Sequence, residues 1–422
     1  MRRRYGRKGW RCATEPLKKP ELLSPAGDFE SLQAACAYGA DAVYVGGTSF
    51  SMRGAPQNFG PETLPKAVEY AHARGVRLYL TCNTLPRSSE LPALPEFLAA
   101  AKRAGADALI VTDLGVLELA KKFAPGVELH VSTQAGVVNY AAANALFALG
   151  ASRIVAAREL SLAELAELRA QTPRALSVEA FVHGAMCVSF SGRCLLSDYL
   201  TGRDANRGVC AQPCRWRYAL SEETRPGEYF PVFEDASGTT ILNARDLCML
   251  GHIPELARAG VGSFKIEGRA KSAYYVAVVT NAYRMAIDGW ARQGSAWRCP
   301  PELLREADAV SHRPYCTGFY FGPAEKGDYA GSGYLRSFEV CADSCEGPLW
   351  TVRNPFSPGE SFELLEPGKP GRAVELRSLR DERGRPLARA QSPGMRVLPE
   401  LSEQAQPFAL LRRAVRGPSI GG

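Results

Sequence analysis

Gly39-Ala-Asp-Ala-Val-Tyr-Val45 and Gly105-Ala-Asp-Ala-Leu-Ile-Val111 are nearly the same sequence, and each leads from a helical stretch into a short apolar strand. Other short apolar runs, separated by amphipathic helical stretches, lie at 21–24, 76–81, 127–132, 149–155, 176–182 and 259–266. Strands that alternate with helices in this way are typical of a parallel sheet that is buried on both faces. Eight such β/α units over about 250 residues predict a TIM-like barrel.

The alternative to the barrel is a doubly wound open sheet, but the chain has no Gly-rich phosphate loop of either standard pattern. We predict an α/β fold with the TIM-like barrel over 21–325 and a Cys-rich insertion, at about 183–245, before the last strand. After the barrel, short strands split by Pro and Gly predict a small all-β C-terminal domain, a β-barrel over 326–410. Residues 1–20 are then a basic N-terminal extension, and 411–422 a tail.

The composition is that of a globular protein, with 422 residues, of which 46% are hydrophobic and 23% charged. No apolar run is long enough to span a membrane, and no apolar segment follows the basic N-terminus as in a secretory signal. We therefore expect a cytoplasmic protein without a membrane partner. Because the cytoplasm is reducing, its twelve cysteines are expected to be thiols rather than disulfides.

Four cysteines, Cys187, Cys194, Cys210 and Cys214, lie close together in the predicted insertion. Thiols gathered in this way indicate a metal, an iron–sulfur cluster, a redox pair or a nucleophile. Structural zinc sites favour two to four residues between paired ligands, which the second pair has and the first lacks. A 4Fe–4S cluster takes four thiolates at irregular spacing, so the spacing favours a cluster and leaves zinc and a reactive cysteine open.

Two sets of residues predict contact with nucleic acid. The net charge is +7, and residues 1–20, including Arg2, Arg3 and Arg4, are rich in Lys and Arg. Such an arm attracts polyanions, although a solubilising tail has the same composition. Arg215 and Trp216 combine charge with a stacking surface for a base, and the alternative is that Trp216 packs in the core.

Active sites of TIM barrels lie at the carboxyl ends of the strands. The residues at the predicted strand ends are mostly polar or charged: Ser24, Gly46, Asn83, Asp113, Ser132, Gln134, Arg158, Glu159, His183, Glu267 and Arg269. Each alone is also a common cap or turn residue, but their recurrence favours a functional mouth.

Glu179-x-Phe-Val-His-Gly-x-x-Cys187-x-x-x-x-Gly-x-Cys194-Leu-Leu-Ser197 resembles the signature of the collagenase-like peptidase family. Glu21-Leu-Leu-Ser-Pro-Ala-Gly27 and Ser263-Phe-Lys-Ile-Glu-Gly-Arg269 do so too, and the resemblance covers roughly residues 20–400. The family includes oxygen-independent hydroxylases that carry an iron–sulfur cluster. One branch hydroxylates the wobble uridine of tRNA with prephenate as the donor, and others act on a ribosomal-RNA cytidine or in ubiquinone synthesis. The short β domain after the barrel makes this chain most similar to the tRNA branch.

The resemblance implies a 4Fe–4S cluster on Cys187, Cys194, Cys210 and Cys214, with Cys248 as a spare candidate. It also implies prephenate as a co-substrate and, as partners, the anticodon loop of tRNA and an unidentified electron donor. We expect the catalytic groups to be His183, Glu267 and Arg269, and the substrate-binding groups to be Arg158, Lys265, Gln134 and Asn83.

Several alternatives remain open at this point. The cations of the predicted site could instead form salt bridges with Glu159 and Glu267. A cysteine or metal-dependent peptidase is the first rival function, since His183 and Cys187 are close in sequence, but thiolates bound to iron leave none to attack a peptide. The other rivals are a hydroxylase of rRNA or of a quinone precursor, and a non-catalytic RNA-binding protein.

Overall fold

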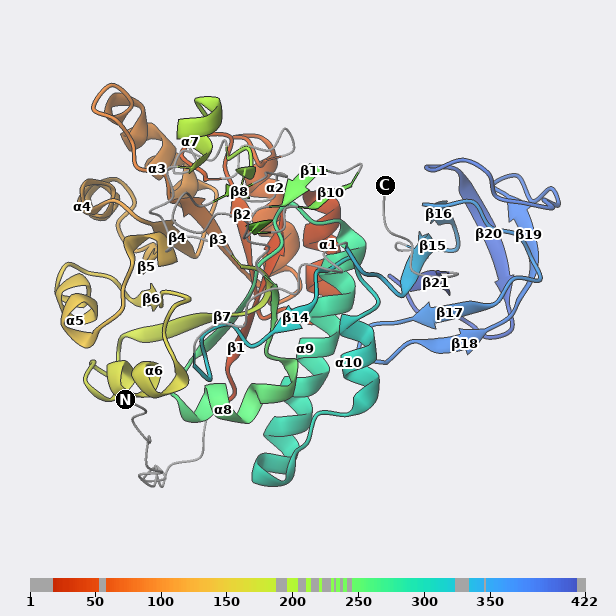
Figure 1. Cartoon of the computed structure of the whole chain (residues 1–422). Coiled ribbons are helices and arrows are strands. Elements are labelled where there is room, and N and C mark those ends of the chain that lie inside the picture. Colours follow the sequence, from red (N-terminus) through yellow and green to blue (C-terminus); the bar gives the residue numbers. More distant parts are fainter. Residues whose placement is uncertain are drawn as a thin grey trace.

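A computed structural model describes residues 18–52, 58–186, 196–203, 210–213, 245–322, 334–344 and 347–415, together with the backbone of four short strands between 220 and 240. Within these residues, eight parallel strands form a closed barrel (Figure 1). They are β1 (Glu21–Ala26), β2 (Ala42–Gly46), β3 (Arg77–Cys82), β4 (Ala108–Val111), β5 (Glu128–Val131), β6 (Arg153–Val155), β7 (Ser177–Ala185) and β13 (Ser263–Ile266). Strand β13 pairs with both β1 and β7, which closes the barrel and confirms the TIM-like fold over the open sheet.

The repeated Gly-Ala-Asp motif explains how each helix turns into the next strand. Gly39 and Gly105 have φ angles of 91° and 83°, a left-handed conformation that lets glycine end a helix without strain. Two residues later, Asp41 and Asp107 accept the backbone amides of Leu22 and Leu78, at 2.8 and 2.7 Å, from the neighbouring strand. The motif therefore both ends a helix and fixes the first residues of two adjacent strands.

Helices cover the outside of the barrel. The α-helices are α1 (Phe29–Ala37), α2 (Thr63–His72), α3 (Leu94–Arg103), α4 (Leu114–Phe123), α5 (Tyr140–Ala148), α6 (Leu162–Ala170), α9 (Ala273–Gln293) and α10 (Pro301–Ala307), with 3-10 turns at Leu91–Ala93, Thr133–Ala135 and Gly294–Ala296. Asp28, Asp113, Asn139, Ser161 and Ser272 cap the starts of α1, α4, α5, α6 and α9 by accepting a backbone amide. No helix of the described chain is long and apolar enough to cross a bilayer.

The predicted insertion lies between β7 and β13. Its described elements are α7 (Leu196–Thr201), β8 (Leu220–Ser221), β9 (Tyr229–Phe230), β10 (Phe233–Asp235), β11 (Gly238–Thr240), β12 (Asp246–Cys248), a 3-10 turn (Leu250–His252) and α8 (Ile253–Arg258). Strand β12 pairs antiparallel with the end of β7 and parallel with β14 (Tyr315–Cys316). This pairing anchors the end of the insertion to the carboxyl end of a barrel strand.

The C-terminal part of the described chain is an antiparallel sheet of seven strands. In chain order they are β15 (Phe338–Ser344), β16 (Trp350–Val352), β17 (Phe362–Leu365), β18 (Arg372–Val374), β19 (Leu376–Asp381), β20 (Arg396–Leu401) and β21 (Leu410–Ala414). The all-β character is as predicted, but the boundary differs, because residues 411–414, which we assigned to a tail, form most of β21. These residues form a strand because β21 is hydrogen-bonded on both sides, between β17 and β15.

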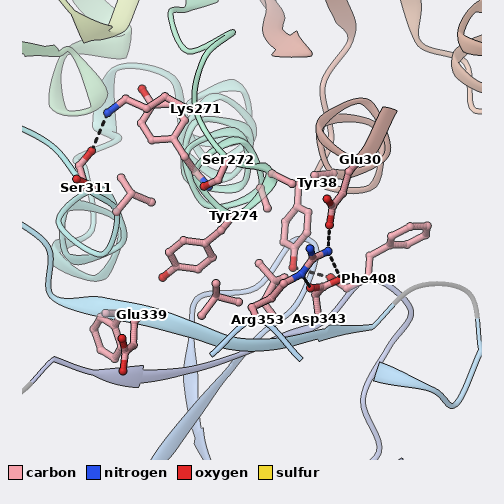
Figure 2. Close-up of a pocket in the computed structure, with 18 of the residues that line it drawn as sticks. Glu30, Tyr38, Lys271, Ser272, Tyr274, Ser311, Glu339, Asp343, Arg353 and Phe408 are labelled. Atoms are coloured by element: carbon pink, nitrogen blue, oxygen red, sulfur yellow. Dashed lines mark hydrogen bonds and ion pairs between the residues drawn. The ribbon is translucent and has the colours of Figure 1, made fainter. Parts of the chain in front are cut away.

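The C-terminal sheet is docked on the barrel through helices α1, α9 and α10 (Figure 1). Arg412 is fully buried, and its Nη1 and Nη2 donate to the two carboxylate oxygens of Glu306 in α10, at 2.6 and 2.8 Å. A cavity of about 410 Å³ lies between the two parts. On its wall, Arg353 bridges Glu30 of α1 and Asp343 of β15 (Figure 2).

Candidate active site at the barrel mouth

A network of charged side chains fills part of the barrel interior. Arg153 donates to Glu21 at 2.6 Å and to Glu179 at 3.1 Å, and Lys265 donates to Glu179 at 2.8 Å. Ser263 adds hydrogen bonds to both carboxylates. The network contains two carboxylates and two cations, so its net charge is zero and each buried charge lies beside one of opposite sign.

The electrostatics of this network depend on its pairing. Burial alone would raise the pKa of Glu179, but the charges of Lys265 and Arg153 outweigh it and lower that pKa to about 2. Burial would lower the pKa of Arg153, and Glu179 and Glu21 raise it instead. Both partners are therefore ionised at neutral pH, and Lys265 is held as an ordered ammonium group inside the barrel.

Lys265 and Arg158 meet at the ring of Phe181. The Lys265 Nζ lies 5.5 Å from the centre of this ring, and the Arg158 Cζ lies 3.8 Å from it. Arg158 donates to the carbonyl of Ala185 at 2.7 Å and lies 3.6 Å from Glu267. Its Nε is buried without a hydrogen-bond acceptor in the described part of the chain.

Arg269 lies across the mouth of the barrel above strand β2. Its Nη1 donates to Ser51 Oγ at 2.7 Å and to Thr81 Oγ1 at 2.9 Å, and the residue is 6% exposed. A Cβ atom built on Gly46 would lie 2.2 Å from this same nitrogen. The glycine at the end of β2 therefore makes the space that the guanidinium occupies.

Asn83 and Gln134 belong to the same rim. The Asn83 side chain accepts the amide of Met52 at 3.1 Å, and its carbonyl accepts Thr112 Oγ1 at 3.1 Å. Thr112 also lies 3.3 Å from Gln134 Oε1. Hydrogen bonds thus connect the ends of β3, β4 and β5 along one side of the mouth.

The predicted cations gather at one end of the barrel, but their partners differ from the alternative we considered. Arg158 does pair with Glu267, whereas Lys265 pairs with Glu179 and not with Glu159 or Glu267. Lys265 is the last residue but one of β13, and its ammonium group is directed at Glu179 in the barrel interior.

His183 occupies a different environment from the other predicted catalytic groups. Its ring is 1% exposed and packs against Tyr275, Tyr283 and Tyr315. Burial lowers its pKa to about 3, so the imidazole is neutral at physiological pH. The structure therefore describes His183 as a packed, uncharged ring, whereas Glu267 is 16% exposed beside Arg158.

Most of the residues predicted to bind iron or RNA lie outside the described residues, namely Arg2, Arg3, Arg4, Cys187, Cys194, Cys214, Arg215 and Trp216. Cys210 is described, and its sulfur accepts the amide of Gln212 at 3.3 Å. The amide of Ala211, which lies between these two residues, donates to the hydroxyl of Ser197 in α7 at 2.9 Å. Amides that donate to sulfur are characteristic of iron–sulfur sites, so this loop is compatible with a cluster ligand.

Cys248 lies on β12 and is paired with His183 across the β7–β12 ladder. Because Cys187 follows β7 directly in sequence, Cys248 is anchored near the point where the segment with Cys187 and Cys194 begins. Burial raises the pKa of its thiol to about 12. Within the described residues, no three His, Cys, Asp or Glu side chains come together as a metal site.

Several residues that support the mouth were not predicted from the sequence, namely Glu21, Ser51, Thr81, Thr112, Arg153 and Glu179, whereas Gly46 was placed at the end of its strand as expected. A signal existed for the charged ones. Glu179 and Arg153 each interrupt a short apolar strand, and a charge in such a strand needs a buried partner. The hydroxyl groups gave no comparable signal.

Comparison with known proteins gives two matches to one family. Residues 27–329 match the family described as Peptidase family U32, and residues 349–412 match the Peptidase family U32 C-terminal domain. The first match covers the barrel from the end of β1 onward, with the insertion, and the second covers most of the C-terminal sheet.

Relatives with assigned names are similar along nearly the whole chain. The chain is 35% identical to tRNA hydroxylation protein P of Escherichia coli, over 94% of this chain and 98% of the relative. It is 33% identical to tRNA hydroxylation protein P1 of Bacillus subtilis, over 94% and 95%. A 23S rRNA 5-hydroxycytidine C2501 synthase of Escherichia coli is 36% identical over 73% of this chain, but this match spans only 46% of the relative's own length.

Proposed function

The chain belongs to peptidase family U32, and we propose that it is a tRNA hydroxylase that forms 5-hydroxyuridine at the wobble position of the anticodon. The observation that carries the proposal is the similarity to relatives named tRNA hydroxylation proteins across both the barrel and the C-terminal sheet. The rRNA relative extends well beyond the part that this chain matches, which favours tRNA over rRNA as the substrate.

We further propose prephenate as the hydroxyl donor, bound at the barrel mouth by Arg158 and Arg269. Two features support an anionic ligand there. The buried Arg158 Nε lacks an acceptor in the described residues, and a carboxylate oxygen would supply one. Ser51 and Thr81 hold one nitrogen of Arg269, which fixes the orientation of its planar fork for a carboxylate.

In this proposal Lys265 acts from below the mouth. Glu179 holds its ammonium group at 2.8 Å, so Lys265 contributes a fixed positive charge and does not move toward the ligand. Glu267 is the proton-transfer candidate at the mouth, since its partly exposed carboxylate lies beside Arg158. His183 would support it through packing, because its buried ring stays neutral.

We propose that the insertion holds a 4Fe–4S cluster through Cys187, Cys194, Cys210 and a fourth thiolate from Cys214 or Cys248. The amide contact to the Cys210 sulfur supports a ligand role for that residue, and the anchored position of Cys248 keeps it as a candidate. When bound, an iron–sulfur cluster offers a reversible electron couple. An electron donor is then required as a partner.

The main rival is a cysteine peptidase, as the family name suggests. Such an enzyme needs a thiol with a lowered pKa beside a histidine that can be protonated. Cys187, the cysteine that the sequence places near His183, lies outside the described residues. The described cysteine opposite His183 in the strand pair is Cys248, whose thiol pKa is raised, while that of His183 is lowered. Both shifts oppose a thiolate–imidazolium pair, so the described residues favour the hydroxylase.

The test is mass spectrometry of tRNA nucleosides from a host that lacks its own homologue and expresses this chain. We expect 5-hydroxyuridine to return, and to be lost again in a host that cannot make prephenate. Absence of 5-hydroxyuridine from a folded, iron-loaded protein would refute the hydroxylase proposal. Protein purified without oxygen should hold about four irons per chain. Single Cys214→Ser and Cys248→Ser variants identify the fourth ligand, because only loss of a ligand reduces the iron content.

A further inference from the structure

The far edge of the C-terminal sheet is rich in arginine. All cationic side chains after Lys369 are arginines, and the exposed ones on and between β19 and β20 are Arg377, Arg380, Arg383, Arg385, Arg389 and Arg396. We call this set the arginine edge. Figure 1 shows β19 and β20 on the side of the sheet that is remote from the barrel.

The backbone gathers these side chains at one turn. The carboxylate of Asp381 accepts the amides of Arg383 and Arg385, both at 2.9 Å, and the Nε of Arg385 at 2.7 Å. Arg380 is bridged to Pro386 across the turn. On the neighbouring strand, Asp381 is in register with Val397, which places the adjacent Arg396 beside the same turn. Asp381 therefore organises the turn around its own charge.

Ion pairing divides the arginines of the C-terminal domain into two groups. Those near the barrel or inside the sheet have carboxylate partners in the described structure: Arg353, Arg372, Arg412 and Arg413. On the arginine edge, Arg380, Arg383, Arg389 and Arg396 form no ion pair with any described carboxylate. Between residues 376 and 401 six arginines thus stand against three carboxylates, those of Asp381, Glu382 and Glu400, so the edge carries an excess of positive charge.

We propose that the arginine edge binds the phosphate backbone of the tRNA substrate, at a distance from the barrel mouth. This inference rests on the proposed function, because it takes the same tRNA as the partner. Arginine presents a planar fork that matches two phosphate oxygens, which a lysine cannot do. An RNA that places one nucleotide in the barrel and also reaches the remote edge of the sheet must be extended, as a tRNA is and a single nucleotide is not.

Contacts of this kind give affinity without sequence choice. Each phosphate that a cation neutralises releases counterions, and this makes binding weaken as salt rises. Loss of three arginines that contact phosphate should lower the slope of log affinity against log salt by about three. The same change should reduce affinity for tRNA about tenfold or more at 0.15 M salt.

The experiment compares two variants with the same change in net charge. The test variant carries Arg380→Gln, Arg383→Gln and Arg389→Gln, all at the arginine edge. The control changes three exposed arginines of the barrel domain, in or just after the last turns of helices α8 and α9. These changes are Arg258→Gln, Arg292→Gln and Arg298→Gln. Binding of fluorescein-labelled, full-length tRNA transcript is measured by anisotropy at several salt concentrations, and thermal unfolding verifies that both variants fold.

We expect the test variant to lose affinity and slope while the control stays within about twofold of the parent protein. Equal losses in both variants would overturn the proposal, because they would reflect net charge alone, and so would an unchanged test variant. Vesicles with anionic lipids provide a second arm, and a loss of vesicle binding without loss of tRNA binding would also overturn it. Because the readout is binding, failure of uridine hydroxylation would refute the proposed function and leave this inference standing.

Discussion

Substitution of Gly46 by alanine provides a sharp test of the barrel mouth. Gly46 ends strand β2, and its backbone does not adopt a positive φ, so alanine brings no conformational strain. Its Cβ, however, would lie 2.2 Å from Arg269 Nη1, 2.8 Å from Asn58 Oδ1 and 3.0 Å from Arg269 Cζ. Ordinary contacts between such atoms are about 3.5 Å, so the guanidinium has to move by roughly 1 Å or more.

This displacement has different consequences for stability and for activity. The guanidinium ends a flexible side chain, so the chain still folds, and weakening of the bonds to Ser51 and Thr81 costs about 1–3 kcal/mol. A misplacement of 1 Å at a substrate-positioning group can reduce a rate by about 100-fold. We therefore expect Gly46→Ala to lose most of its 5-hydroxyuridine formation while it keeps its iron and its cooperative unfolding.

The assay is the nucleoside analysis in a host without its own homologue, with the iron content and melting temperature of the purified variant measured in parallel. Gly60→Ala is the matched control, since a Cβ there meets only Thr48 Cγ2, at an ordinary 3.7 Å. Arg269→Ala should reproduce the loss. If Gly46→Ala retains full activity, the position of Arg269 above β2 has no part in the reaction.

Two further predictions concern the buried charges. Arg412→Met should destabilise the chain by about 3–5 kcal/mol in denaturant unfolding, because Glu306, 1% exposed, loses its two short bonds to Arg412 and keeps only the amide of Gly371 and the more distant Arg305, at 3.9 Å. The double variant with Glu306→Leu should recover much of this loss, and no recovery would contradict the explanation. The second prediction is acid sensitivity: the pKa of Glu179 is lowered from 4.5 to about 2, so its contribution is complete above pH 4.5 and is lost as pH falls toward 2. Its size is on the order of 3 kcal/mol, and Glu179→Gln should be less stable at pH 7 and show a shallower loss of stability over that pH range.

The barrel could be predicted from sequence because its signals are local. Gly39 and Gly105 end helices through their backbone freedom, and Asp41 and Asp107 pin adjacent strands, so each repeat marks a helix-to-strand turn by itself. The end of the C-terminal domain was predicted less well. Strand β21 is short and contains Arg412, and an arginine near a chain end looks like part of a solvated tail unless its partner, Glu306, is known.

The orientation of side chains in the barrel strands could not be predicted in the same way. Alternation along a strand identifies the inward face only when one face is polar, and strands of a parallel barrel are buried on both faces. The pairing of β13 with β7 also shifts register between Lys265 and Ile266, so that Lys265 is opposite Phe181 and Ile266 is opposite His183. Such an irregularity changes which face a side chain takes. His183 consequently packs among tyrosines, although its place at the end of β7 suggested a group in the mouth.

The distribution of charge separates the part of the barrel that supports the site from the part that is prepared for a ligand. Inside the barrel, Glu21 and Glu179 balance Arg153 and Lys265, and such a set holds its shape without any further ion. Arg153 in this network and Arg158 each have a buried Nε without an acceptor in the described residues, which costs about 1–3 kcal/mol as long as it stays unbonded, and it is Arg158 that lies at the mouth. A ligand oxygen at the Arg158 Nε would remove that cost. The neutral network therefore fixes the position of Lys265. A ligand that supplies an acceptor to Arg158 would bind at the mouth, where the hydrogen bonds of Arg269 to Ser51 and Thr81 already hold a second cation in place.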